Sequence, residues 1–380
     1  MIEHEFTSRI REILQKHFRD SAEDVFQQSP LLQYLNIKTR SATRGAKARS
    51  SFANIYAVYV LVEDYVKREF HKSGKYLRYE GARFSDLFKR QRELPFGRKL
   101  QNHALNHRMN EEFKKFFSQV SYVPILRDVD KNRYWINENL LKVRVGKTTH
   151  NLAEAIIEIT DEYMVVKRQA FDRFIKTCER LKSLPRSDKE EAEKFILGLL
   201  APNVDARIFE IVSYAILKSF YHDQKVYFGF DLDSIKPEQL KLYKTGRTNA
   251  NDGGIDFVMR PLGRFFQVTE TLDVKKYFLD IDKIERFPIT FVIKSDASVE
   301  TLKARLKEGA EKQYAVAAIV AKYMKCVEEI INIPILRERF AQAVAQGYLQ
   351  NILDEIVRQS KVEFNYEEDE SDEPESSEDE

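Results

Sequence analysis

The segment "NANDGGIDFVMRPLGRFFQVTE", residues 249–270, predicts how the C-terminal half of the chain folds. Its two apolar arms flank the "PLG" sequence at 261–263, in which proline and glycine favour a tight turn. The pattern therefore predicts a β-hairpin. If residues 260 and 263 close the turn, Asp256 lies opposite Gln267, and a bulged turn would shift this register by one residue. In either register, we expect these two side chains to lie within reach of each other.

The second arm of the hairpin carries polar side chains at alternate positions. Alternation places Phe265, Gln267 and Thr269 on one face of the strand, and Phe266 and Val268 on the other. Carboxylate and amide oxygens are ligands that Mg²⁺ accepts, whereas a threonine offers only a hydroxyl. We interpret the hairpin as a candidate metal-binding corner, and a purely structural hairpin is the alternative.

Regular elements are expected on both sides of the hairpin. The stretch "DARIFEIVSYAILKSFYH", 205–222, predicts a helix, and its Glu210 is either directed toward the metal or a solvated helix position. "KVYFGF", 225–230, predicts a strand, and "PITFVIKS", 288–295, predicts a buried one. "KKYFLDIDKIERF", which lies between the hairpin and that buried strand, is expected to be partly helical. Long helices are expected at 298–330 and 333–360.

The N-terminal half is expected to be rich in helix, apart from a strand-like stretch at 121–150. One or two helices are expected within 1–35. A helix in "SFANIYAVYVLVEDYVKREF" is expected to be buried on more than one side. The "PRSD" sequence at 185–188 suggests a domain boundary. We therefore predict an α/β (α+β) protein with three parts: a helix-rich basic region at 1–185, a mixed β-sheet core flanked by helices at 186–362, and an acidic tail at 363–380.

The charges are distributed unevenly along the chain. Its 62 Lys and Arg residues nearly balance 60 Asp and Glu residues, but ten of the acids lie within Glu367–Glu380. The rest of the chain therefore has a formal excess of 12 positive charges. A basic body favours a polyanionic partner, and the composition of the tail predicts disorder. The tail either screens that body or only aids solubility.

Several side chains suited to phosphate or base contacts are concentrated in three segments. The candidate DNA-binding residues are Arg44, Lys47, Arg49, Arg98, Lys99, Gln101, Asn102, Asn106, Arg108, Arg247, Asn249 and Asn251. An ordinary solvated surface is the alternative for each segment. His103 and His107 are four residues apart, but they lack the Glu of a zincin helix and accompanying cysteines, so a zinc site is not favoured.

An acid-bearing helix, a strand, "DGGID" and a strand with "FQVT" together resemble the Mrr-like branch of the PD-(D/E)xK nucleases. The resemblance covers roughly residues 205–295. It implies a restriction-endonuclease-like core, Mg²⁺ as the cofactor and hydrolysis of DNA phosphodiester bonds. Asp256 matches the motif aspartate, Gln267 matches the Glu/Gln position, and Glu210 resembles the helical acid of many members. These three residues are therefore the expected metal ligands.

The sequence departs from the family pattern at Thr269, which occupies the position of the motif lysine. A hydroxyl cannot stabilise developing negative charge as an ammonium group does. Three explanations remain open: the lysine has moved to Lys275, Lys276 or Lys294; the site uses Glu270 or a water network; or the domain binds DNA without cutting it.

Other classes of protein receive little support from the sequence. Only Cys178 and Cys326 are present, which argues against a disulfide framework. "GKTTH", 146–150, lacks the upstream glycine of a P-loop, so no nucleotide cofactor is expected. The N-terminus lacks the features of a signal peptide, and no apolar run is as long as a membrane span, so we expect a cytoplasmic protein.

The sequence thus favours a type II restriction endonuclease that cuts double-stranded DNA with Mg²⁺. A homodimer is expected, because two-fold symmetry suits cleavage of both strands of a palindromic site. The alternatives are a non-catalytic DNA-binding protein on a degenerate nuclease fold and a nuclease specific for damaged or modified DNA.

Overall fold

The computed structural model describes most of the chain. The described residues are 3–40, 48–98, 100–184, 189–245, 255–270, 278, 281, 287–314 and 316–364, with side chains omitted at 48–51 and 364. The chain divides into two compact units, Met1–Phe174 with Glu363–Glu380 (unit 1) and Ile175–Val362 (unit 2). The division falls inside the long helix α9, Ala153–Ser183, whereas the predicted boundary at 185–188 lies outside the described residues.

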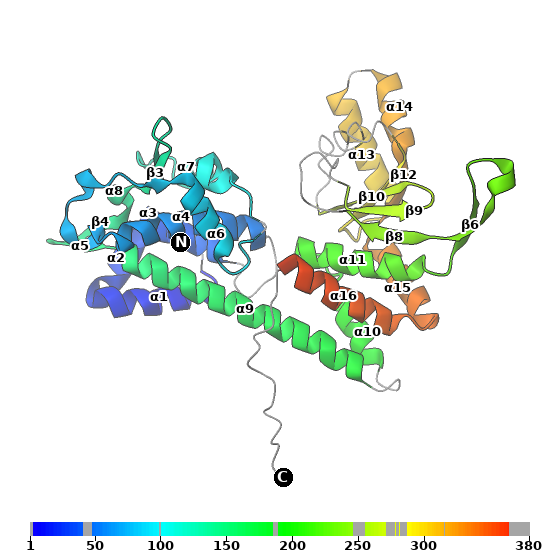
Figure 1. Ribbon diagram of the computed structural model, residues 1–380, viewed down its shortest axis with the longest axis horizontal. Coiled ribbons are helices and arrows are strands. Elements are labelled where there is room, and N and C mark those ends of the chain that lie inside the picture. Colours follow the sequence, from blue (N-terminus) through cyan, green and yellow to red (C-terminus); the bar gives the residue numbers. More distant parts are fainter. Residues whose placement is uncertain are drawn as a thin grey trace, which may run out of the picture. The chain divides into compact units, whose positions relative to one another are not determined.

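The predicted α/β class is confirmed. Helix accounts for 62% of the structure and strand for 16%, and a five-stranded mixed sheet is flanked by helices. Figure 1 shows the helices and strands of both units.

Unit 1 consists mainly of helices around one apolar core. Its helices are α1 Glu5–Phe18, α2 Ala22–Gln28, α3 Pro30–Thr39, α4 Ala48–Lys67, α5 Phe70–Ser73, α6 Phe84–Glu93, α7 Met109–Phe116, α8 Glu138–Leu141 and the first part of α9. A π-helical turn, Ala104–Arg108, precedes α7. Its strands form two small sheets and are β1 Ala82–Arg83, β2 Ile125–Asp128, β3 Arg133–Ile136, β4 Lys142–Val145 and β5 Thr148–Asn151.

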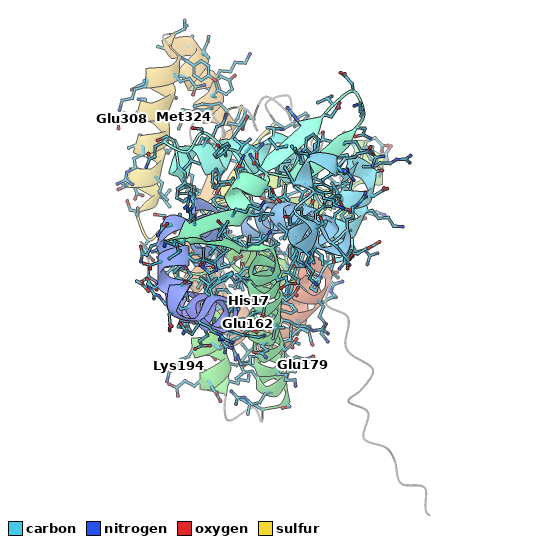
Figure 2. The ribbon with its side chains drawn as sticks, turned by 90° about the vertical axis from the view of Figure 1, so that its left-hand side faces the viewer. His17, Glu162, Glu179, Lys194, Glu308 and Met324 are labelled. Carbon is cyan, nitrogen blue, oxygen red and sulfur yellow. The ribbon has the colours of Figure 1, made fainter. Side chains whose placement is uncertain are left out.

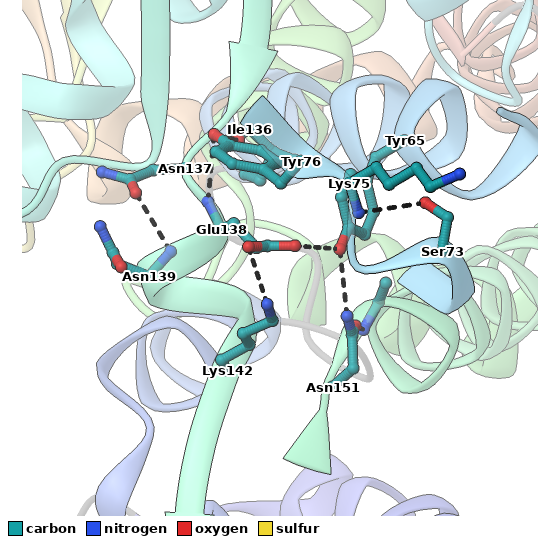
Figure 3. A network of polar contacts seen from close by, with 11 residues as sticks. Tyr65, Ser73, Lys75, Tyr76, Ile136, Asn137, Glu138, Asn139, Lys142 and Asn151 are labelled. Carbon is teal, nitrogen blue, oxygen red and sulfur yellow. Dashed lines mark hydrogen bonds and ion pairs between the residues drawn. The ribbon is translucent and has the colours of Figure 1, made fainter. Parts of the chain in front are cut away.

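Helix α4 is the centre of unit 1, as its dense apolar sequence predicted. Phe52 and Tyr56 lie on one side of the helix and Tyr65 on another, and all three are buried. The Tyr65 hydroxyl donates a hydrogen bond to Glu138 (2.8 Å) and accepts one from Asn151 (3.1 Å). This network, shown in Figure 3, links α4 to α8 and β5 and pairs the buried phenol with polar partners.

Helix α1 is connected to α9 by ion pairs. The Arg9 guanidinium lies 2.7 Å from the Glu162 carboxylate, and Lys16 and His17 both contact Glu158 at 2.8 Å. Figure 2 shows His17 and Glu162 close together on these two helices. These residues are partly exposed, so each pair contributes little to the free energy of unfolding. The pairs help to set the orientation of α1 against α9.

Unit 2 is built on the five-stranded sheet. Its helices are the second part of α9, α10 Lys189–Gly198, α11 Ala206–Phe220, α13 Val299–Gln313, α14 Ala317–Cys326, α15 Ile333–Ala345 and α16 Leu349–Phe364. Its strands are β6 Lys225–Phe228, β7 Lys236–Gln239, β8 Lys241–Lys244, β9 Phe257–Arg260, β10 Arg264–Thr269, β11 Ile289–Ile293 and β12 Val327–Ile331. Strands β6 and β7 form a separate hairpin.

The order of the sheet is β12-β11-β10-β9-β8. Strands β8, β9 and β10 are antiparallel neighbours, whereas β10, β11 and β12 run parallel to one another. The predicted hairpin is confirmed, because Phe266 pairs with Phe257 and Arg264 pairs with Met259. This is the unbulged register. Strand β11 is buried at all five positions, as its continuous apolar sequence predicted.

The two faces of the sheet pack against different helices. On one face, Phe257 and Phe266 contact Tyr214 and Tyr221 of α11. On the other, Phe291 and Ile293 share a core with Leu302 of α13. We call these the α11 face and the α13 face. Figure 2 labels Glu308 and Met324 on the α13–α14 pair.

Two expectations about the elements were wrong. The predicted helix at 298–330 is interrupted, and its last residues form β12 beside β11. Residues 236–244 were not expected to contain strands, yet they form β7 and β8. Both errors have one cause: these short strands are stabilised by pairing with other strands, which the periodicity of their own residues does not detect.

Candidate functional site

Asp256 directly precedes β9 and is held by the neighbouring strand β10. Its backbone N–H donates to the Phe266 carbonyl (2.9 Å), and its Oδ2 accepts a hydrogen bond from the Val268 N–H (2.7 Å). Its backbone carbonyl accepts a hydrogen bond from the Thr245 N–H (3.0 Å) on the strand at the other side. The hairpin register therefore fixes both the backbone and the carboxylate of Asp256.

The environment of Asp256 opposes its ionisation. Burial raises the pKa of this carboxyl, and the nearby Glu210 carboxylate raises it further, to about 8. The Val268 N–H, Arg207 and Lys244 lower the pKa and so offset part of this effect. A buried carboxyl next to a second acid is typical of sites that bind a cation or transfer a proton.

Glu210 supplies the second acid from α11. This helix begins at an Asp205 cap, whose side chain accepts hydrogen bonds from two backbone N–H groups. Glu210 is buried one turn further on, where one carboxylate oxygen pairs with Arg207 and the other lies 3.3 Å from the Lys244 ammonium. The alternative of a solvated helix position is therefore wrong, and the role of Glu210 as a metal ligand stays a prediction.

A second ion pair lies on the same face. Lys294 follows β11, and its backbone N–H donates to the Thr269 carbonyl (2.9 Å). Its side chain is only 2% exposed, and the ammonium group contacts Glu270 at 2.7 Å. It also donates to the Val204 carbonyl, just before α11, and lies over the Phe209 ring. Lys294 is therefore directed toward the α11 face.

Gln267 and Thr269 occupy the opposite face. Gln267 pairs with Phe291 and Thr269 with Ile293, both of which belong to the core beneath α13. Ile255 also packs into that core, whereas the charges that act on Asp256 are those of the α11 face. The ladder between β9 and β10 ends at Phe257 and Phe266, so the predicted pairing of Asp256 with Gln267 is not observed, and the two side chains lie on different faces of the sheet. The Gln267 Oε1 atom is buried and has no hydrogen-bond partner in the described structure.

The α11 face offers oxygen ligands suited to Mg²⁺. Asp256, Glu210 and Glu270 are carboxylates, and hard oxygen ligands are the preferred partners of this ion. No group of three acidic, histidine or cysteine side chains lies close enough to hold a metal by itself among the described residues. Mg²⁺ commonly binds through one or two protein carboxylates together with substrate phosphates and water, so Asp256 and Glu210 fit that mode.

Part of the predicted site lies outside the described residues. This applies to Lys275 and Lys276, to the loop residues Arg247, Asn249 and Asn251, to Arg44, Lys47 and Lys99, to the side chain of Arg49 and to the acidic residues from Glu367 onward.

The other candidate DNA-binding residues cluster before α7 in unit 1. Arg98, Gln101, Asn102 and Arg108 are exposed. Asn106 is half-buried, and Arg127 donates to its side-chain oxygen (2.9 Å), so it is already engaged within the protein.

Sequence reasoning missed Arg207 and Lys244, which balance the charge of Glu210. The pairing of Arg207 with Glu210 could have been predicted, because side chains three residues apart on a helix are neighbours. Lys244 carries no comparable signal, because its position depends on the pairing of β8 with β9.

Comparisons with protein-family models, with curated proteins and with solved structures found no match to this chain. Within the described ranges, no helix combines the length and the apolar character needed to cross a membrane.

Proposed function

We propose that unit 2 is the catalytic core of a Mg²⁺-dependent type II restriction endonuclease that hydrolyses phosphodiester bonds in double-stranded DNA. The observation that carries the proposal is the burial of Asp256 beside Glu210, which together raise the pKa of the Asp256 carboxyl. Two acids in one buried place are costly for a purely structural hairpin, whereas a divalent cation would compensate both.

The proposal assigns the missing positive charge to Lys294. Its buried ammonium group reaches the α11 face from the strand next to β10, one position beyond the residue paired with Thr269. There it would stabilise negative charge that develops on the scissile phosphate. Glu270, its partner, would take the place expected for Gln267 and supply the second polar side chain of the hairpin at the site. Bound Mg²⁺ would supply Lewis-acid polarisation of the phosphate and activation of water.

Asp256 and Glu210 would act together as the ligands. Binding of the cation requires Asp256 to lose its proton and Glu210 to exchange Arg207 or Lys244 for the metal. The released cations would then be available to contact a DNA phosphate. Unit 1 would contribute DNA contacts through Arg98, Gln101, Asn102 and Arg108.

A digest of plasmid DNA tests the proposal directly. The purified chain with Mg²⁺ should give discrete fragments, and Asp256→Ala should abolish cleavage while retaining most of the DNA affinity. Asp130→Ala, which changes an exposed acid in the β2–β3 turn of unit 1, is the control and should cut normally. Full activity of Asp256→Ala would refute the site, and lack of cleavage of any plasmid by the wild-type chain would refute the nuclease assignment.

One observation favours a second candidate, a DNA-binding protein without catalytic activity. Both oxygens of Glu210 already have cationic partners, so the buried charges are compensated without a metal. This candidate predicts salt-sensitive DNA binding that Mg²⁺ neither strengthens nor converts into cleavage. Isothermal titration calorimetry of Mg²⁺ binding in the presence of duplex DNA separates the two candidates. Only the nuclease candidate predicts Mg²⁺ binding that Asp256→Ala abolishes.

A further inference from the structure

Two arginines face each other across neighbouring strands of the β1-β3-β2 sheet in unit 1. Arg83 of β1 pairs with Arg133 of β3, so both side chains project from the same face of the sheet. Alternation along β3 places Trp135 on this face, whereas Tyr134 and Ile136 are buried on the other. Arg83 is exposed, and Arg133 and Trp135 are half-buried, so solvent reaches this face. We call it the arginine face.

The positive charges of this pair are not neutralised by a carboxylate. Within the described part of the chain, neither arginine forms an ion pair. Asp128 lies opposite Arg133 on β2, but it is bound to Lys131, whose backbone N–H donates to it (3.1 Å) and whose ammonium group lies 3.6 Å away. Like charges directly opposite each other destabilise a sheet, so the arrangement is unfavourable in the protein alone. Three exposed acids that are close in sequence also pair with neither arginine: Glu80, Asp86 and Asp130.

Gly81, which directly precedes β1, holds the Arg133 side chain in place. Its carbonyl accepts a hydrogen bond from the Arg133 Nη1 atom (3.3 Å), which uses only one of the N–H donors of the guanidinium. The backbone φ of Gly81 is +71°, and a Cβ there would lie 2.6 Å from the Tyr134 carbonyl oxygen and 3.1 Å from the Trp135 ring. Because glycine alone allows this approach, the guanidinium and the indole ring both lie against one residue.

We propose that Arg83 and Arg133 form a phosphate-binding site that holds one backbone phosphate of duplex DNA. Two guanidinium groups on adjacent strands present forked N–H donors, which match the oxygens of a phosphate. A bound phosphate would also compensate the two charges that oppose each other in the protein alone. It thus supplies the anionic partner that the described chain does not provide.

The position of the sheet favours DNA as the source of the phosphate. On the edge strand β2, Arg127 donates to the backbone carbonyl (3.1 Å) and to the side-chain oxygen (2.9 Å) of Asn106. The sheet therefore adjoins the exposed candidate DNA-binding residues that precede α7. A phosphate held on the arginine face would help to fix the register of the duplex on unit 1. The inference rests on the DNA-binding part of the proposed function and is independent of the metal site.

Titration of the full chain with a short DNA duplex in EDTA, which prevents cleavage, tests the inference. Trp135, the single tryptophan, lies on the arginine face, so its fluorescence should change on binding. Arg83→Gln/Arg133→Gln should weaken binding of a labelled duplex at least about tenfold and reduce the salt slope by about 1, because both arginines hold one phosphate. Arg144→Gln is the matched control and should bind as the wild type does, since this exposed strand arginine lies opposite the uncharged Thr149.

Urea unfolding of the DNA-free protein gives a second readout. Arg83→Gln should raise the urea midpoint of unit 1, followed by Trp135 fluorescence, at low salt. The gain should disappear at high salt, because screening removes the repulsion that the substitution relieves. Arg144→Gln should leave the midpoint unchanged at both salt concentrations. A lower midpoint for Arg83→Gln would assign a structural role to this arginine and overturn the inference.

Inorganic phosphate distinguishes the two sources of the ligand. A Trp135 response to inorganic phosphate that Arg83→Gln/Arg133→Gln abolishes, in a chain that does not bind the duplex, would support the site but overturn DNA as its source. Equal affinity of the wild type and the double variant for both ligands would overturn the inference, as would a wild type that binds neither. Duplex binding that depends on both arginines, in a chain that cuts no plasmid with Mg²⁺, would support the inference and reject only the nuclease assignment.

Discussion

Asp256→Asn should remove activity and stabilise the metal-free protein. Asparagine can accept the same hydrogen bond from the Val268 N–H, but it carries no charge that must be buried beside Glu210. If Asp256 were only a structural hydrogen-bond acceptor, the substitution would have little effect or would destabilise the hairpin. A substitution that removes activity and raises the free energy of unfolding therefore indicates a functional site.

The magnitude follows from the pKa of Asp256, which lies at about 8 in the folded chain and about 3.9 in the unfolded chain. Between these values the folded state binds more protons than the unfolded state, so the free energy of unfolding falls as the pH rises. The slope for one proton is about 1.4 kcal/mol per pH unit. From pH 5 to pH 8, the wild-type protein should therefore lose about 4 kcal/mol relative to Asp256→Asn.

Urea unfolding in EDTA at pH 5 and pH 8 measures this difference. Far-UV circular dichroism follows both units, and the fluorescence of the single tryptophan, Trp135, follows unit 1. Asp130→Asn is the matched control and should leave the pH dependence unaltered. Adding Mg²⁺ at pH 8 should restore part of the wild-type stability, because a bound cation favours the carboxylate.

A gain at pH 8 of less than about 1 kcal/mol for Asp256→Asn over the wild type, or an equal gain at both pH values, would refute the reasoning.

Three further predictions concern the proposed nuclease. Lys294→Met should lower the rate of plasmid cleavage at least about 100-fold through loss of the ammonium group, whereas Lys303→Met on the exposed side of α13 should cut normally; equal rates would exclude a catalytic role for Lys294. In single-turnover assays with Mg²⁺, Glu270→Gln should slow cleavage more than Gln267→Ala, because only Glu270 lies on the α11 face, and the reverse order would restore the original motif assignment. Arg108→Ala should weaken duplex binding and reduce the salt slope by about 1, while Arg78→Ala, elsewhere in unit 1, should not; a slope unchanged by Arg108→Ala would remove this residue from the DNA contacts.

Local sequence signals were sufficient for the hairpin. The "PLG" turn determines how the two arms pair, and the observed pairs next to the turn are those it predicted, although they end at Phe257 and do not include Asp256. Continuous apolar residues identified β11 as a buried strand, and the dense aromatic pattern identified α4 as a buried helix. These features depend on neighbours in the sequence, where periodicity and turn chemistry act directly.

The face of each side chain depended on tertiary packing. Alternation grouped Gln267 with Thr269, but only the packing of α11 and α13 decided which face of the sheet receives Glu210. The same packing brought Lys294, one of three lysines that the sequence offered, to Glu270, and brought Lys244 to Glu210 through a strand that had not been expected.

By itself, the sequence determined that an acid would lie at the start of a β-hairpin preceded by an acid-bearing helix. Only the tertiary structure decided that Asp256 and Glu210 are buried together beside the half-buried Lys244, and that the buried Lys294 pairs with Glu270 on the same face. The physical reason is that charge burial is a property of the assembled sheet and helices: the pKa of Asp256 rises because separate elements exclude water from one place, and no local pattern encodes that exclusion.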